Sequence, residues 1–265
     1  DALVRNVARG SKDVGLFEIG LVVARDGEQT SAPTEDVGVQ PSPEVLAAIH
    51  RAVPRQPRHL AILLAGDRDR AGWWGEGRPA DVSDVLGLVR SVADALAVPV
   101  VLSGSADVMP FHPGRCAAIS LADGTLVGHA GELHPKVVAA LGLPSRTVAA
   151  ELDLDVLIAA SEDPVAARTL VTSPAAYTDL AVVVDEAVTA GSLEASLATG
   201  AGEMLESITL FDVYRGDQVG PGRKSLAYRL AFRAPDRTLR TEEVSALRDA
   251  ALARAAVDLG ATQRT

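Results

Sequence analysis

The sequence predicts an α+β protein built from two domains, and three observations support this prediction. A chain of 265 residues, 48% of them hydrophobic, is long and apolar enough to bury more than one core. Short apolar runs typical of strands are interspersed with segments whose apolar residues recur at helical spacing. The stretch 161–178 contains Pro164 and Pro174 and has no clear periodicity. We therefore expect a domain boundary there, between domains 1–165 and 172–265.

The first domain mixes strands and helices. The segment after Asp81 is predicted to be a helix, with Asp81 or Ser83 as its N-cap. Its apolar residues Val85, Leu86, Val89, Val92 and Leu96 follow helical spacing. Two further helices are expected at 43–53 and 133–143. Strands are expected at 16–23, 59–66, 98–103, 116–121, 125–131 and within 145–160, and 67–81 is expected to be a loop.

The second domain has a more legible order. Strands are predicted at 179–185, 205–214 and 223–233, with a last strand at 261–265. One helix is predicted at 192–200, with Ser192 as its cap and Gly200 as its end. Another is predicted from Thr241, as its cap, to Leu259, with Gly260 after its end. The order β-α-β-β-α-β is that of the split, ferredoxin-like arrangement.

Alternation along these strands assigns their two faces. The residues expected to point toward the helices are Leu180, Val182, Val184, Phe211, Val213, Leu226, Tyr228, Leu230 and Phe232. Asp179, Asp212, Tyr214, Arg229 and Arg233 are expected on the opposite, open face. An open sheet face with a tyrosine and two arginines resembles the surface on which RNA-recognition motifs stack bases. The other interpretation is structural, with Asp179, Asp212 and Arg229 forming an ion-pair cluster.

The charge distribution points to the same region. The net charge of -10 argues against indiscriminate nucleic-acid binding. Between residues 215 and 240, however, seven basic side chains face two acidic ones, a net charge of +5. Such a patch can hold phosphates, although an ordinary solvated hairpin would have the same composition. The candidate RNA-binding residues are Tyr214, Arg215, Arg223, Lys224, Arg229 and Arg233.

Other features limit the alternatives. No apolar run reaches the ~18 residues of a membrane span, and the start does not read as a signal peptide. The single cysteine, Cys116, suits a reducing cytoplasm and is expected to be a buried small residue. His129, Glu132 and His134 are close together but match no metal motif, and a turn before a helix explains them better. Trp73 and Trp74 either anchor a partner or fold onto the domain's own core.

Several motifs resemble one family. "DLAVVVDEAV" (179–188), the combination FDxYxG, KSLAYRL and DRTLxxEEV, and the terminal "GATQR" resemble the ferredoxin-fold anticodon-binding domain. That domain ends the β subunit of bacterial phenylalanyl-tRNA synthetases. "FEIG" (17–20), "LAILLAGD" (60–67), "HPGRCAAI" (112–119) and "LVGHAGELHPKV" (126–137) resemble the catalytic-like module of the same subunit. One departure is Thr178, which stands before Asp179 where relatives usually have arginine.

The resemblance implies a fold and a role. Residues 1–165 would form a class II synthetase-like antiparallel sheet flanked by helices, without catalytic activity. Residues 172–265 would form the ferredoxin-like anticodon-binding domain. The chain would then be the C-terminal part of a longer β subunit in a cytoplasmic α2β2 heterotetramer. Its implied partners are the α subunit and tRNA(Phe). The complete ligase would attach phenylalanine to this tRNA with ATP and Mg.

The resemblance also implies where catalysis does not occur. A class II active site binds ATP with an arginine in an F-R-x-E context and another in a G-x-G-x-x-R context, and neither is found in 1–171. We therefore expect no catalytic residue, no metal site and no cofactor in this chain. The alternative function is a purely structural, subunit-interaction fragment without direct RNA contact.

Overall fold

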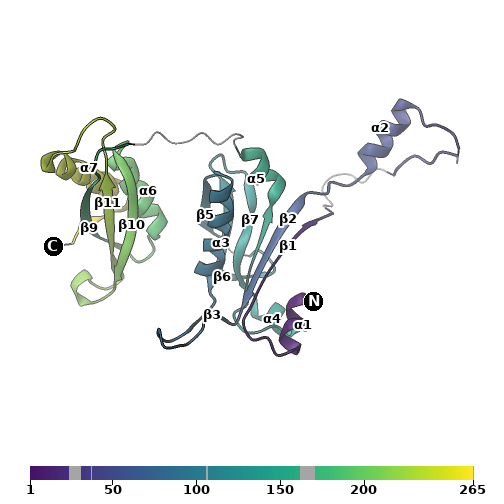
Figure 1. The fold of residues 1–265 in the computed structure, drawn as a ribbon, viewed down its shortest axis with the longest axis horizontal. Helices are drawn as coiled ribbons and strands as arrows, with labels where there is room; N and C mark the ends of the chain where they lie inside the picture. Colours follow the sequence, from purple (N-terminus) through teal and green to yellow (C-terminus); the bar gives the residue numbers. More distant parts are fainter. Residues whose placement is uncertain (24–30, 37, 106, 162–170, 265) are drawn as a thin grey trace. The chain divides into compact units, whose positions relative to one another are not determined.

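The computed structural model describes residues 1–23, 31–36, 38–105, 107–161 and 171–264. The chain divides into two compact units, Asp1–Ala166 and Ala167–Thr265 (Figure 1). Part of the predicted boundary segment, 162–170, lies outside the described residues. Within the described ranges, we find no helix with the length and hydropathy needed to cross a membrane.

Unit 1 is built on a six-stranded antiparallel sheet with the order β1-β2-β8-β7-β6-β5. Helices α3 and α5 pack against this sheet, where Leu60, Ile62, Val85, Ile119 and Leu152 are buried. The strands are β1 (Val14–Leu21), β2 (Arg58–Ala65), β3 (Asp67–Asp69), β4 (Arg78–Pro79), β5 (Val100–Gly104), β6 (Phe111–Leu121), β7 (Leu126–Leu133) and β8 (Val148–Asp153). The helices are α1 (Ala2–Ala8), α2 (Pro43–Ala52), α3 (Val82–Ala95), α4 (Pro135–Leu141) and α5 (Leu154–Ala160).

Helix α3 begins as the sequence predicts. The Asp81 carboxylate accepts hydrogen bonds from the backbone N–H groups of Ser83 and Asp84 at 2.8 and 3.3 Å. The Asp84 carboxylate accepts one from the Asp81 N–H at 2.9 Å, which completes a capping box. Val85 and Val89 are fully buried against the sheet. The predicted N-cap and apolar face of this helix are confirmed.

Three segments of unit 1 differ from the sequence prediction. Residues 2–8 form helix α1, which was not predicted. The strand expected within 145–160 ends at Asp153, and helix α5 follows because the Asp153 carboxylate caps it by accepting from the Asp155 and Val156 N–H groups. The expected loop 67–81 contains the short hairpin β3–β4.

Unit 2 confirms the ferredoxin-like β-α-β-β-α-β order. Its antiparallel sheet has the order β10-β11-β9-β12, and the two helices cover one face. The core combines residues such as Leu180, Tyr228 and Phe232 of the sheet with Leu193 and Ala255 of the helices. The elements are β9 (Ala176–Asp185), α6 (Ala190–Ala201), β10 (Leu205–Tyr214), a 3-10 turn (Asp217–Val219), β11 (Arg223–Phe232), α7 (Thr241–Leu259) and β12 (Thr262–Gln263).

The predicted N-caps of both helices in unit 2, and the predicted end of the first, need correction. Helix α6 is capped by Thr189, whose hydroxyl accepts from the Ser192 N–H at 3.1 Å, and it continues through Gly200. Gly200 does not end α6. It allows α6 and α7 to cross closely, because a Cβ there would lie 2.6 Å from the Cβ of Arg254 on α7. In α7, Thr241 is the first helical residue, and Arg240 precedes it as the N-cap.

The predicted faces are correct for β9 and β11 but wrong for part of β10. Phe211 and Val213 were expected to point toward the helices. Val213 is paired with Leu226, which points that way, although Val213 is 42% exposed near the end of its strand. Phe211 is 54% exposed and lies beside Arg229 on the open face. The cause is a register shift between Leu210 and Asp212, which leaves Phe211 without a partner on β11. Ile208 and Leu210 pack against the core instead.

Candidate nucleic-acid interface

The candidate interface is the helix-free face of the sheet in unit 2. Tyr214, Ser225, Val183 and Thr262 form a row across the four strands, from β10 to β12. Ser225 and Val183 are buried although neither α6 nor α7 covers this face. Longer side chains from the two outer strands and from the turn Asp217–Val219 therefore lie above this end of the sheet.

Tyr214 and Arg264 are the two long side chains that meet above this row. The Arg264 guanidinium lies 4.3 Å from the centre of the Tyr214 ring, which is a cation–π contact. It also donates a hydrogen bond to the Gln218 side-chain carbonyl at 2.5 Å. A hollow of about 540 Å³ opens beside Arg264 and is lined by Val183, Gln218, Val219, Arg223, Thr262 and Gln263.

Arg223 contributes a second cation to this hollow. One of its terminal nitrogens donates to the Val183 carbonyl at 3.3 Å. Its Nε is buried, has no hydrogen-bond partner among the described residues, and lies 3.9 Å from the nearest Asp185 oxygen. No ion pair of Arg264 is found in the described part of the chain. Beside the hollow, Arg223 thus has one long ion pair, with Asp185, and Arg264 has none among the described residues.

Lys224 is not part of this surface. Its side chain is buried, and its ammonium group donates to the Glu186 backbone carbonyl at 2.8 Å. The alternation that turns Leu226 and Tyr228 toward the helices turns Lys224 the same way. Lys224 was grouped with the neighbouring Arg223 because both are basic. Successive residues of a strand point to opposite faces, however, so the two side chains lie on different sides of the sheet.

Arg215 lies at the start of the loop after β10 and is paired. Its guanidinium contacts the Glu186 carboxylate with nitrogen–oxygen distances of 2.8–3.2 Å. Hydrogen bonding from Arg215, with a smaller contribution from Lys224, lowers the pKa of Glu186. Because both side chains are well exposed, the pair is accessible to solvent and to ligands.

Arg229 lies further along the same face and forms the predicted ion pair with Asp179. The contact is bidentate, at 2.8 and 2.9 Å, and it lowers the pKa of the Asp179 carboxyl. The guanidinium also lies 5.5 Å from the centre of the exposed Phe211 ring. Asp212 makes no hydrogen bond or ion pair with Asp179 and Arg229 among the described residues, so the predicted three-member cluster is a pair.

Tyr177 adds another ring beside this pair. It is 66% exposed and lines a hollow of about 420 Å³ together with Thr178, Asp179 and Arg229. Arg233, at the end of β11, is instead bound to Glu206 at 2.9 Å and to the Ser173 carbonyl. Its side chain is three-quarters buried, which leaves less of it for a ligand.

Arg264, Tyr177 and Phe211 were not among the RNA-binding residues predicted from the sequence. Arg264 contacts Tyr214 only because the short strand β12 pairs with β9 and the loop after β10 carries Gln218 to it. Tyr177 lies just before the strand predicted to start at Asp179, and β9 in fact begins at Ala176. A longer strand with continued alternation would have placed Tyr177 on the open face.

Other candidate groups have structural contacts. The Nδ1 of His134 accepts the Lys136 N–H at the start of α4, and Glu132 is buried and paired with Arg115 at 2.8 Å. Cys116 is buried as predicted, and burial raises the pKa of its thiol. Among the described residues, no group of three His, Cys, Asp or Glu side chains is arranged to hold a metal ion.

Comparisons with known proteins place both units. Residues 1–154 match the family described as the phenylalanyl tRNA synthetase beta chain CLM domain, and residues 172–264 match the ferredoxin-fold anticodon binding domain. Three curated relatives are named phenylalanine–tRNA ligase beta subunit. Those of Thermobifida fusca (strain YX), Streptomyces avermitilis and Nocardia farcinica are 50%, 49% and 46% identical over 99%, 100% and 98% of this chain. These alignments cover 32%, 32% and 31% of the relatives, so the chain spans about a third of their length.

Proposed function

Because this chain belongs to the phenylalanyl-tRNA synthetase beta chain family, we propose that it serves a phenylalanine–tRNA ligase as part of the β subunit. The ligase attaches phenylalanine to its tRNA with ATP and Mg, in the cytoplasm, as an α2β2 heterotetramer. In this proposal the α subunit performs the chemistry. Unit 1 is a non-catalytic class II-like module that docks the α subunit, and unit 2 binds the anticodon region of tRNA(Phe).

In this proposal unit 1 does not bind ATP and Mg, because its side chains do not suit a triphosphate. "FEIG" has no arginine before its Glu18 to face a triphosphate, and Phe17 and Ile19 beside it are exposed apolar side chains of an edge strand. Arg115, a cation of the central strands, is already bound to Glu132. In this proposal no catalytic step takes place on this chain.

The observation that carries RNA binding is the pair of arginine–aromatic contacts on the helix-free face of unit 2. Arg264 lies over Tyr214 and Arg229 lies over Phe211. Rings and guanidinium planes are the groups on which unstacked bases stack. Arg264, which has no ion pair among the described residues, and Arg223, whose contact with Asp185 is long at 3.9 Å, are the cations best able to hold backbone phosphates. Arg215, Arg229 and Arg233 would exchange a carboxylate for a phosphate.

Binding of tRNA at several salt concentrations tests this proposal. The α–β complex carrying Tyr214→Ala should bind tRNA(Phe) more weakly by roughly 1–3 kcal/mol with an unchanged salt slope, because a stacking contact is lost. Arg223→Ala should flatten the slope by about one, because a phosphate contact is lost. Val257→Ala, at an exposed position of α7, is the control. If Tyr214→Ala and Arg223→Ala both bind tRNA like the control and the unaltered complex, the chain is an interaction fragment without RNA contact.

The apolar face of unit 1 supports docking of the α subunit. Strand β1 is at the edge of the sheet, and Phe17, Ile19 and Leu21 are exposed along it. An apolar hollow of about 750 Å³ lies beside them, lined largely by leucine, isoleucine and valine from β1, β2, α3 and α5. An uncovered edge strand next to such a hollow is typical of a surface that is buried in an assembly.

Paired substitutions on the two edge strands test the docking surface. Phe17→Ser together with Ile19→Ser should abolish or strongly reduce co-purification of the co-expressed α subunit. Val101→Ser, at an exposed position of the opposite edge strand β5, should not. Equal recovery of α with both variants would show that the β1 face is not the docking surface.

A further inference from the structure

The two tryptophans of the chain lie together at the tip of the β3–β4 hairpin. Trp73 and Trp74 are the two residues between Gly72 and Gly75, whose backbone groups exchange hydrogen bonds at 3.0 and 3.1 Å. Trp73 is 94% exposed and Trp74 is 65% exposed. The tip therefore does not fold onto the core of unit 1. Of the two interpretations of these tryptophans, packing onto the domain's own core is wrong.

The tip is held in one geometry. The indole N–H of Trp74 donates to the Arg70 carbonyl at 3.1 Å, and a Cβ at Gly72 would lie 2.6 Å from the Trp74 ring. Trp74 is thus folded back against its own hairpin. Trp73 meets it edge to face with ring centres 5.7 Å apart, and Trp73 itself makes no hydrogen bond among the described residues. Trp74 supports Trp73, which projects into solvent.

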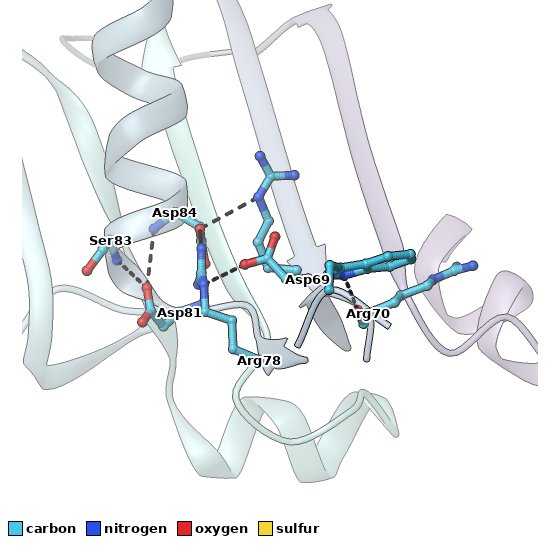
Figure 2. A network of polar contacts seen from close by, with 8 residues as sticks. Asp69, Arg70, Arg78, Asp81, Ser83 and Asp84 are labelled. Atoms are coloured by element: carbon cyan, nitrogen blue, oxygen red, sulfur yellow. Dashed lines mark hydrogen bonds and ion pairs between the residues drawn. The ribbon is translucent and has the colours of Figure 1, made fainter. Parts of the chain in front are cut away.

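Ion pairs fix the base of the hairpin to the rest of unit 1 (Figure 2). Arg78 binds Asp84 of helix α3 with two hydrogen bonds at 2.7 and 2.8 Å and also contacts Asp69 at 2.7 Å. On the other side, Arg70 pairs with Asp13 at 2.8 Å, and Asp13 also accepts the Asp67 N–H. Such a preorganised apolar projection loses little conformational entropy on binding.

The charges of the hairpin favour a protein partner over RNA. Residues 67–80 contain three arginines and three carboxylates. Each arginine is ion-paired: Arg68 with Asp84, Arg70 with Asp13, and Arg78 with Asp84 and Asp69. With a net charge of zero, the hairpin has no excess positive charge to attract the phosphates of RNA. An exposed tryptophan with a free N–H is, by contrast, the side chain most typical of protein-interface hot spots.

We propose that Trp73 is an anchor of the α-subunit interface, inserted into an apolar slot of α that offers an acceptor for its indole N–H. The hairpin is continuous with the apolar β1 face, since Arg68 lines the hollow there and Asp13, the partner of Arg70, directly precedes β1. A single partner can cover both. This inference rests on the proposed docking of α to unit 1, and it adds the hairpin to that surface.

The affinity of α for the chain tests the anchor. Trp73→Ala should weaken binding about 30-fold or more, the effect expected of a hot-spot residue, and Trp73→Phe should weaken it less. Val101→Ala is the matched control for an exposed apolar side chain elsewhere in unit 1. Unchanged melting temperatures of the free variants would show that the loss is at the interface. Equal affinity of Trp73→Ala and unaltered chains would overturn the anchor while leaving α docking intact.

Fluorine NMR gives an independent readout. Because the chain has two tryptophans, labelling it with 5-fluorotryptophan yields two resonances, both from this hairpin and assignable with Trp73→Phe. Unlabelled α should shift the Trp73 resonance and remove its solvent-isotope effect. If α binds without altering that resonance, or tRNA alone alters it, the hairpin is not an α anchor. If α does not bind the unaltered chain at all, the proposed docking falls as well.

Discussion

At the scale of single residues, Tyr228 illustrates how a polar atom is accommodated in the core of unit 2. The ring is fully buried, and its hydroxyl donates to the Ala190 carbonyl at the start of α6, at 2.8 Å. Burial raises the pKa of this phenol well above its ordinary value of about 10. The neutral hydroxyl is therefore favoured in the folded state.

The raised pKa of Tyr228 makes the stability of unit 2 depend on pH. Since the folded pKa of Tyr228 exceeds the unfolded one, its contribution to stability is complete below pH about 10 and is lost as pH rises toward the folded pKa. Above pH 10, the free energy of unfolding should fall by about 1.4 kcal/mol per pH unit from this group. Denaturant titrations of Tyr228→Phe should lack this component. Tyr177→Phe, which changes an exposed ring, should retain it, and an identical slope in both variants would contradict the assignment.

At the scale of elements, Asp84 joins helix α3 to the β3–β4 hairpin. Its carboxylate completes the capping box with the Asp81 N–H and receives both hydrogen bonds of Arg78. Hydrogen bonding from Arg78 is the main cause that lowers the pKa of Asp84, and the side chain is largely buried. One carboxylate thus orders a helix start and the base of the tryptophan hairpin together.

Replacement of Asp84 should therefore destabilise unit 1. Asp84→Ala should reduce its free energy of unfolding at pH 7 by about 1–3 kcal/mol, because a cap and a charge-assisted bond are lost. Because the folded pKa is depressed, this difference should be present above pH about 4 and shrink as pH falls further. Asp94→Ala, which changes an exposed carboxylate of the same helix, should cost much less. Equal stabilities of the two variants in urea titrations would contradict this account.

At the scale of the whole molecule, two cores serve two proposed tasks. The six-stranded sheet of unit 1 leaves an apolar edge and a tryptophan hairpin exposed, and the four-stranded sheet of unit 2 leaves its helix-free face to arginine–aromatic pairs. Both surfaces suit binding, and neither presents the arginines that ATP requires in a class II site.

The purified chain should accordingly fail to activate phenylalanine. Without arginines facing the triphosphate, the developing charge of the adenylation transition state is not stabilised. Phenylalanine-dependent exchange of pyrophosphate into ATP should be at background for the chain alone and clear for the complex with α. The prediction would be wrong if the chain alone catalysed pyrophosphate exchange at a rate proportional to the amount of chain at each purification step. The chain would then contain catalytic residues.

Features that depend on local interactions could be predicted from the amino-acid sequence. Alternation and helical periodicity gave the element order of unit 2, the buried residues of β9 and β11, and the apolar face of α3. The Asp81 cap and the Gly260 end of α7 follow from backbone groups within a few residues of each other. Such signals are legible because the interacting atoms are neighbours in the chain.

Which side chains form the two surfaces depends on long-range packing and could not be predicted from local patterns. A register shift exposed Phe211, strand parity buried Lys224, and pairing of β12 with β9 brought Arg264 to Tyr214. The exposure of Trp73 likewise depended on whether any core lay within reach of the hairpin. These outcomes depend on contacts between segments far apart in sequence, and a local pattern contains no information about which distant segment will fill the space beside it.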